Sequence, residues 1–591
     1  MEIGNQTSPS PAGEESHLSP PESQSKKPGG WRAIKYILAN ESFEKLASMS
    51  LIANITVYLR TKYNLEGILL VNVVQIWSGT SNISSIAGAI VSDAYLGRFL
   101  TLLIGTVFSL MGMAAMTLTA GLPELRPPAC QDEANCIQPH KWQLAFLFIS
   151  LALIAMGAGG IRPCNIAFGA DQFDTKTKKG RAHLESFFNW WYFSFTIALV
   201  IALTGVVYVQ TNISWLTGFT IPTACLAISI TIFLIGHHTY ICKKPQGTVF
   251  ADMAKVITAA FKKRKIKLGD EHSFYDPVED LDSEARKLIK IKWFKCLDKA
   301  AVIADPSELN EEGLPVNTWR LCSVQQVENL KCLVAIMPVW IAGVGCFVVM
   351  DQQSTFGVLQ ALQMDRSIGK HFMIPPGWMG ISSMIALSIW IFLYEQLYIR
   401  TAKKLMKTDS RLTMQQRIII GIIMSILCMI VAGIVEQKRR ALAISEKSFT
   451  SPLHVLVLLP QFALSGLTEA FAAVALMEFF TIQLPESMRS IAGAIFFLSL
   501  SVASYLSTLI VNMMHSITGQ GGKTPWLGGH DLNNNKLENF YFMVASIGFV
   551  NLIYFTFFAR KYVPFGKNAK VGGLRQVENA EEEESSKQSS I

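Results

Sequence analysis

Long apolar runs are the feature of this sequence that most limits its fold. A helix needs about 20 mostly apolar residues to cross a bilayer, and the chain contains two sets of such runs. The first six lie near 36–59, 70–92, 99–121, 142–166, 187–209 and 215–237, and six more lie near 330–350, 374–396, 415–435, 452–475, 489–513 and 540–560. Only 16% of the residues are charged, against about 25% in soluble domains. The sequence therefore predicts an all-α membrane protein with 12 transmembrane helices.

The two sets of runs predict two halves. We expect a disordered cytosolic tail at 1–30, an N-terminal six-helix bundle at 31–239, a cytosolic linker with an amphipathic helix at 240–329, a C-terminal six-helix bundle at 330–560, and a disordered cytosolic tail at 561–591. Two such bundles are typical of secondary transporters, which bind their solute between the bundles. A channel or a receptor is the alternative interpretation.

Lysine and arginine residues set the expected orientation. The basic segments KTKKGR, FKKRKIK and RTAKKLMK fall in loops on one side, so both termini are expected in the cytosol. One basic loop, EQKRRALAISEK, falls on the other side. We keep the orientation that the three other basic segments favour. We expect the plasma membrane to be the location, with the vacuolar membrane as the alternative.

Three charges stand near the start of the first apolar run. Glu41, Glu44 and Lys45 are spaced i, i+3 and i+4, so they share one helical face. Each charge costs roughly 2.5–3.5 kcal/mol at the centre of a membrane helix. Two carboxylates that share one cation are suited to binding a proton. The alternative is a static cluster that holds the first helix in register.

Other motifs do not support an enzyme. The segment TGQGGKT resembles a phosphate-binding loop, but Ile517 stands where its first glycine is required. Histidines lie in tails, loops or span ends, and cysteines lack metal-ligand spacing; only Cys130 and Cys136, in an outward loop, are expected to form a disulfide. We expect no metal, no cofactor other than coupling protons, and no nucleic-acid partner. The expected partners are a small-molecule or anion substrate and the lipid bilayer, with the oligomeric state left open.

The segment ESFEK resembles the E-x-x-E-R/K signature of the plant nitrate/peptide transporter family, which comprises proton-coupled oligopeptide transporters of the major facilitator superfamily. The passages GAIVSDAYLGRFLT, GGIRPCNIAFGADQFD and FFNWWYFSFT resemble it too, and the match runs from about Gly30 to Arg560. The passages GGIRPC and KKRKIKL resemble a branch that moves nitrate, glucosinolates and other glycosylated metabolites, or plant hormones. The resemblance implies a major facilitator fold of two six-helix bundles and proton-coupled symport by alternating access.

The resemblance also implies a role for each buried charge. It assigns proton coupling to Glu41, Glu44 and Lys45, although lysine cannot make the bidentate contact of the commoner arginine. It implies a salt bridge across the central cavity between Arg162 and Glu469. Both are lone charges in apolar spans, and their pairing could latch the two bundles together.

The passage SDAYLGR resembles a loop that holds the cytosolic ends of helices together through Asp93 and Arg98. We interpret it as a conformational gate. Thr101, three residues after Arg98, fits a basophilic kinase pattern, so a protein kinase is a possible partner.

Substrate choice rests on a departure from the family. In nitrate-transporting relatives a histidine of the seventh span presents positive charge, whereas Met350 stands at that position here. With Trp340, Phe347 and Gln352 nearby, we predict a cavity for a glycosylated or other amphipathic organic solute, because methionine suits bulky apolar surfaces. The alternatives are nitrate as the main substrate, a plant hormone, or a transporter-like sensor without strong flux.

Overall fold

The computed structural model describes residues 29–130, 136–173, 177–243, 249–266, 273–276, 294–311, 313–370, 372–398, 401, 404, 412–484, 489–520 and 524–563. Most of both predicted tails and most of the basic segment RTAKKLMK lie outside the described residues.

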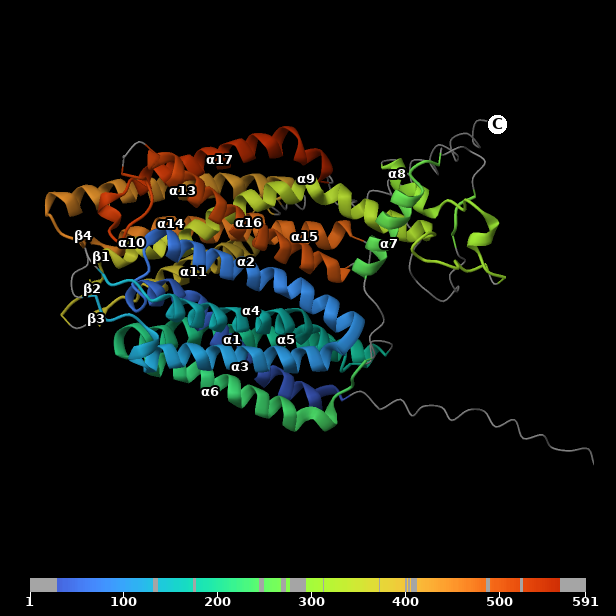
Figure 1. Ribbon diagram of the computed structural model, residues 1–591, viewed down its shortest axis with the longest axis horizontal. Coiled ribbons are helices and arrows are strands. Elements are labelled where there is room, and N and C mark those ends of the chain that lie inside the picture. The colour runs from blue at the N-terminus through green and yellow to red at the C-terminus, as the bar shows by residue number, and fades with distance from the viewer. Residues whose placement is uncertain are drawn as a thin grey trace, which may run out of the picture.

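Two sets of long helices make up the bundle (Figure 1). The first set comprises α1 (Gly30–Thr61), α2 (Gly67–Val91), α3 (Gly97–Gly121), α4 (Lys141–Ala170), α5 (Lys178–Ile201) and α6 (Trp215–Ile235). The second comprises α9 (Val324–Gln352), α11 (Met379–Leu393), α13 (Met414–Ser445), α14 (Leu459–Thr468), α15 (Val474–Gln483), α16 (Arg489–Thr518) and α17 (Leu537–Phe557). The π-helical turn Glu469–Ala473 joins α14 to α15 as one span. The fold is all-α, as the sequence predicts.

Ten described segments are long and apolar enough to cross a membrane. One of them, Gly67–Gly121, contains both α2 and α3, joined through a π-helical turn. The helix α1 has 32 residues but is too polar to be counted among the ten. Adding α1 and separating α2 from α3 yields the twelve predicted helices.

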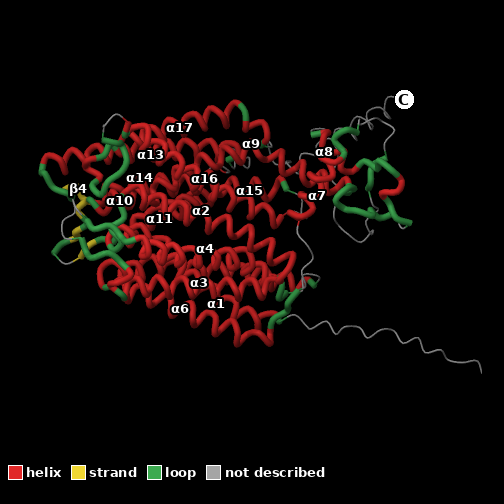
Figure 2. The backbone as a smooth tube through the Cα atoms, in the orientation of Figure 1, coloured by secondary structure: helices red, strands yellow, loops and turns green. Residues whose placement is uncertain are grey.

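Shorter elements lie at the two ends of the bundle (Figure 2). At one end α10 (Val358–Leu362) is followed by β1 (Met364–Asp365), which pairs in parallel with β4 (Ser451–His454), and β2 (Ser367–Ile368) pairs antiparallel with β3 (Phe372–Met373). This end also carries a disulfide between Cys130 and Cys136, and we call it the disulfide end. The opposite end carries α7 (Val249–Lys262) and α8 (Lys295–Asp298), and we call it the linker end.

The linker packs onto the C-terminal half. Met253 and Val256 of α7 are buried in the same apolar core as residues of α9. Lys331 of α9 pairs with Asp298 of α8 at 2.6 Å and with Glu328 at 2.9 Å. The amphipathic helix that the sequence predicts therefore uses its apolar face to join the linker to the C-terminal half.

Glycines allow the helices of the N-terminal half to approach closely. A Cβ atom on Gly88 of α2 would lie 2.0 Å from the carbonyl oxygen of Gly159 on α4. A Cβ atom on Gly160 would lie 2.7 Å from the carbonyl oxygen of Thr101 on α3. Small residues at such contacts bring membrane helices together, and here they fix α2 and α3 against α4, which carries part of the site described below.

The two halves meet along α2 and α16. The side-chain amides of Asn72 and Asn512 bond to each other at 2.8 and 3.0 Å, and the Ser501 hydroxyl donates to the Gly79 carbonyl at 2.8 Å. These contacts lie in the middle of the bundle and towards the disulfide end. Nearer the linker end, no hydrogen bond or ion pair joins described residues of the two halves. The structure is therefore closed at the disulfide end.

Candidate functional site: a buried charge cluster

Three charged side chains of α1 form one buried cluster. The ammonium nitrogen of Lys45 lies 3.0 Å from Oε2 of Glu44 and 3.6 Å from Oε1 of Glu41. The exposed fractions of the Glu41, Glu44 and Lys45 side chains are 2%, 5% and 11%. The local spacing on the helix produces this pairing, because residues three and four apart are neighbours on a helix surface.

Helices α2 and α4 complete the cluster. The Asn165 amide on α4 donates to Oε2 of Glu41. Arg162, one turn earlier on α4, donates to Oδ1 of Asn82 on α2 at 2.8 Å. Glu44 and Arg162 interact electrostatically and line the same cavity of about 20 Å³, which is enough for roughly one water.

The cluster is balanced in charge when both carboxylates are ionised. Glu41 and Glu44 then carry two negative charges, and Lys45 and Arg162 carry two positive charges. A proton added to either carboxylate would leave one cation in excess inside the bundle. This arrangement can therefore convert the binding of a proton into a change in the partners that Lys45 and Arg162 attract.

The structure does not contain the predicted bridge between Arg162 and Glu469. Glu469 begins a π-helical turn in the C-terminal half, and neither residue has an ion-pair partner among the described residues. The halves are not joined at the linker end, so Arg162 bonds within its own half, to Asn82. The two residues are not paired in this conformation, which is closed only at the disulfide end, so the predicted latch between them stays a prediction.

The residues predicted to line a substrate cavity are distributed along α9. Trp340 and Met350 are half-buried and pack against the core. Phe347 is buried with its ring edge against Phe496, and the Gln352 amide is buried and donates to the Val348 carbonyl. None of these four residues lines the cavity beside Glu44 and Arg162. Phe347 and Gln352 are closed off from any solute in this conformation.

The predicted gate lies at the linker end and has more partners than expected. Nε of Arg98 lies 3.8 Å from Oδ1 of Asp93, and Arg98 also pairs with Asp171, which follows α4. Asp171 pairs in turn with Lys243 at 2.7 Å. Sequence reasoning missed Asp171, although it belongs to the quoted passage GGIRPCNIAFGADQFD.

Thr101 is less accessible than a phosphorylation site requires. Its side chain is buried between α3 and α4, and its hydroxyl donates to the Gly97 carbonyl at 2.9 Å. A kinase could reach it only after the start of α3 had separated from α4.

Sequence reasoning also missed Asp351 of α9. One of its carboxylate oxygens is buried without a hydrogen-bond partner among the described residues, and Ser504 of α16 lies within hydrogen-bond reach of the group. The rule that singled out Glu469, a lone carboxylate in an apolar span, would have found Asp351 as well.

Comparisons with known proteins agree on one family. Residues 99–527 match the model of the POT family. The chain is 60% identical to Protein NRT1/PTR FAMILY 2.8 of Arabidopsis thaliana, with 92% of this chain and 97% of that protein covered. It is 43% identical to Protein NRT1/PTR FAMILY 2.13 of the same plant, with 95% and 90% covered.

Solved structures show the same fold. The structure of the POT family transporter PepTSo matches with a TM-score of 0.65 at 18% identity, covering 91% of this chain and 99% of that one. A POT family transporter in complex with 5-aminolevulinic acid matches with a TM-score of 0.57 at 12% identity, covering 92% and 99%.

Proposed function

The chain belongs to the POT family of transporters, and from this membership we propose that it is a proton-coupled symporter that works by alternating access. It is a transporter and not an enzyme. The observation that carries the proposal is the buried cluster in which Glu41 and Glu44 share Lys45 at 3.6 and 3.0 Å. Charged side chains inside membrane-spanning helices are energetically costly, and they are usually paired with each other or serve a function.

The closed disulfide end supports an assignment of which side of the membrane each end of the bundle faces. If the basic loops lie in the cytosol, as their composition favours, then the disulfide end faces outwards, where disulfides persist. The linker end, where described residues of the two halves make no hydrogen bond or ion pair with each other, then faces the cytosol. In the proposed cycle this is an inward-facing form.

The proposed solute is a glycosylated or other amphipathic organic molecule, of the glucosinolate or glucoside class. Met350 supports this choice, because it stands in α9 where nitrate-transporting relatives are expected to carry a cationic histidine. A methionine adapts to bulky apolar surfaces but offers no charge to an anion. Nitrate is the second candidate, because Arg162 and Lys45 remain as cations in the N-terminal half.

The test is a measurement of solute-induced current at acidic external pH, in a membrane held at known potential. Glucosides should evoke inward current and should compete for uptake better than nitrate does. Met350→His should improve nitrate uptake, whereas Met337→His, on the same helix but 40% exposed, should not. Current without net solute uptake would indicate a channel, and binding without either would indicate a sensor. Robust nitrate uptake by the wild-type protein, with no response to glucosides, would show that the solute assignment is wrong.

A further inference from the structure

Another buried ion pair lies in the C-terminal half, apart from the charge cluster of α1. Glu436 and Arg439 are both on α13, one turn apart, and both side chains are 0% exposed. The Arg439 guanidinium donates to the two carboxylate oxygens of Glu436 at 2.7 and 2.8 Å, and to the side-chain oxygen of Asn533 at 2.9 Å. The desolvation of a buried pair offsets much of its attraction, so such a pair is a weak source of stability. Its other contacts indicate a different role.

Three side-chain amides connect this ion pair to the span made of α9 and α10. The amide nitrogen of Gln360, on α10, donates to Oε2 of Glu436 at 2.9 Å. The amide nitrogen of Gln461, on α14, donates to the side-chain oxygens of Gln360 and Gln353, each at 3.0 Å. Gln353 begins the π-helical turn Gln353–Gly357, which joins α9 to α10. All these side chains are buried, and we call the three amides the glutamine relay.

The carboxylate of Glu436 sets the direction of every bond in the relay. An ionised carboxylate can only accept hydrogen bonds, so Gln360 presents its amide nitrogen to Glu436 and its oxygen to the opposite side. That oxygen accepts from Gln461 and also from the Tyr541 hydroxyl of α17 at 3.0 Å. Gln461 must then donate to Gln353 as well. The charge of Glu436 therefore fixes α10 against α13, α14 and α17 together.

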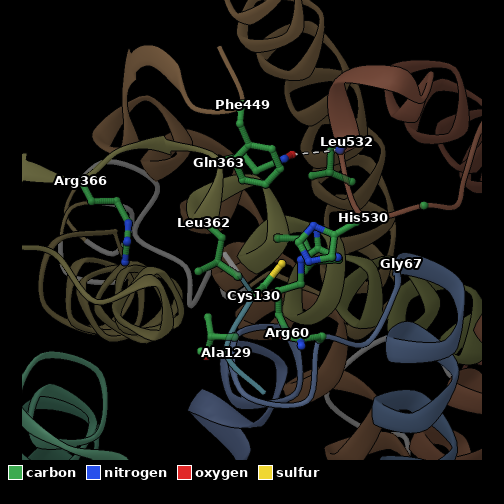
Figure 3. A pocket seen from close by; sticks show the side chains of 14 residues that line it. Arg60, Gly67, Ala129, Cys130, Leu362, Gln363, Arg366, Phe449, His530 and Leu532 are labelled. Carbon is green, nitrogen blue, oxygen red and sulfur yellow. Dashed lines mark hydrogen bonds between the residues drawn. The ribbon is translucent and has the colours of Figure 1, made fainter. Parts of the chain in front are cut away.

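The end of α10 is attached to the same half. The side chain of Gln363, which follows α10, accepts from the Leu532 N–H at 3.1 Å and donates to Asp531 at 3.0 Å. Figure 3 shows the first of these bonds as a dashed line. Leu362 and Gln363 also border a cavity of about 280 Å³ at the disulfide end, which Arg60 of α1 lines from the N-terminal half. On this side α10 borders open space, whereas its relay side is bonded.

We propose that the Glu436–Arg439 pair and the glutamine relay position α10, so that α10 moves with the C-terminal half when the disulfide end opens. The opening then separates this span from α1, where the Thr56 hydroxyl donates to the Ser354 carbonyl at 3.4 Å, near the limit of a hydrogen bond. Helices bend at π-helical turns, so without the relay α10 could bend there and stay with α1. Glu436 and Arg439 are thus positioning residues, and their role rests on the proposed alternating-access cycle.

Hydrogen–deuterium exchange tests the attachment of α10, with the full-length protein in nanodiscs and no solute present. Glu436→Gln keeps the size of the side chain but removes the fixed acceptor, so amide exchange in residues 354–363 should become at least about tenfold faster. Exchange in residues 420–432 of α13 should stay the same. Glu538→Gln is the matched control, because it removes a carboxylate that pairs with Arg440 between α17 and α13 but lies outside the relay. Equal acceleration in both segments, or in neither, would overturn the proposal.

Exchanging the two groups of the Glu436–Gln360 bond tests the direction of the relay. Gln360→Glu alone places two carboxylates side by side and should also accelerate exchange in residues 354–363. The double variant Glu436→Gln with Gln360→Glu keeps one carboxylate at this bond, and Tyr541 and Gln461 still find an acceptor. Its exchange should return to within about threefold of the wild type, because groups that act together give non-additive effects. Additive acceleration in the double variant would overturn the relay.

Turnover tests the role of the relay in the cycle. For uptake of a glucosinolate, or of nitrate if that is the solute, kcat should fall at least about tenfold in Glu436→Gln while KM changes by less than about twofold, because only the opening step is affected. The double variant should recover most of kcat, and Glu538→Gln should match the wild type.

An unchanged or faster kcat in Glu436→Gln would overturn the role in opening, since α10 would then work while detached from its half. A wild-type protein that transports neither solute would contradict the proposed function instead. In that case the exchange measurements alone would decide whether the relay holds α10.

Discussion

Glu41 and Glu44 differ in their surroundings although both pair with Lys45. Glu41 accepts a hydrogen bond from Asn165, whereas Glu44 lines a small cavity together with Arg162. Asn165 therefore holds Glu41 in place, whereas Glu44 lies beside space for roughly one water and is the nearer partner of Lys45.

Neutral replacements test the coupling role of both carboxylates. Glu41→Gln or Glu44→Gln keeps the size of the side chain and its hydrogen bonding but removes the titratable group. Accumulation driven by a pH gradient should fall by about tenfold or more, while the amount of protein in the membrane stays the same. Uptake measured with and without a pH gradient checks this.

The matched control is Glu478→Gln. Glu478 is 43% exposed and pairs with Arg417 away from the cluster, so its loss should leave the pH response intact. Full pH-driven accumulation in both cluster variants would exclude the coupling role.

His530 links the disulfide end to pH. Burial is the main cause that lowers the pKa of His530 from 6.5 to about 4. The positive charge of Arg60 lowers it further, and Asp531 opposes the shift. The unfolded chain therefore binds a proton at this position between about pH 6.5 and 4 while the folded protein does not, so stability falls as the pH drops through that range.

The prediction for His530 is a smaller dependence of stability on pH. In His530→Gln the melting temperature should fall less between pH 7 and pH 4.5 than it does in the wild type. His238→Gln, at an exposed position of the linker end, serves as the control and should retain the wild-type dependence. Identical pH profiles for wild type and His530→Gln would show that His530 is not protected from protonation.

At the scale of the element, the contact between α2 and α4 depends on glycines, which have no side chain. A Cβ atom at Gly88 would meet backbone atoms of Gly159 at 2.0 and 2.6 Å, and backbone cannot move aside as a flexible side chain can. Overpacking of this kind costs typically about 1–3 kcal/mol. The contact also positions Asn82 of α2 against Arg162 of α4.

Gly88→Ala should therefore lower the melting temperature and the yield of folded protein, and it should reduce transport per molecule by displacing Asn82. Gly380→Ala in α11 is the control, because nothing lies within 4 Å of its added Cβ atom. A Gly88→Ala protein with wild-type stability and transport would show that α2 and α4 can separate at no cost.

The helix α1 shows how a polar element is kept in a membrane protein. It is not among the segments that are apolar enough to span by themselves. Its buried polar side chains find partners on other helices: Asn40 bonds Ser229 of α6 at 2.8 Å, and Tyr58 bonds Thr119 of α3 at 2.7 Å. Tertiary contacts therefore stabilise α1 where its own hydropathy does not.

At the scale of the whole molecule, the membrane potential tests how many protons accompany the solute. Moving one charge through 100 mV is worth about 2.3 kcal/mol. A neutral glucoside gains this energy with one proton, whereas a monovalent anion needs two protons to gain it. Inward current should accompany uptake in either case, and it should grow as the membrane is made more negative. Strictly electroneutral uptake, measured as tracer flux without current, would contradict this and would imply one proton per monovalent anion.

The sequence by itself determined the features that depend on local composition and spacing. Apolar runs of bilayer length predict helices because backbone groups in lipid must bond within their own segment. Glu41, Glu44 and Lys45 could be placed together because residues three and four apart on a helix are neighbours. Membership of a transporter family could also be predicted, since the motifs around these charges are contiguous in the chain.

Only the tertiary structure decided the contacts between distant segments. A helix that is apolar all round carries no signal for which face is buried, so Phe347 could not be assigned to the core from its sequence. Asp171 was not recognised as a partner of Arg98 because Arg98 lies on α3 and Asp171 follows α4, 73 residues later in the chain. Arg162 was expected to pair with Glu469 of the other half, whereas the structure pairs it with Asn82 of its own half. The cavity at the disulfide end collects residues from Arg60 to Leu532, and only the packing of the two halves brings them together.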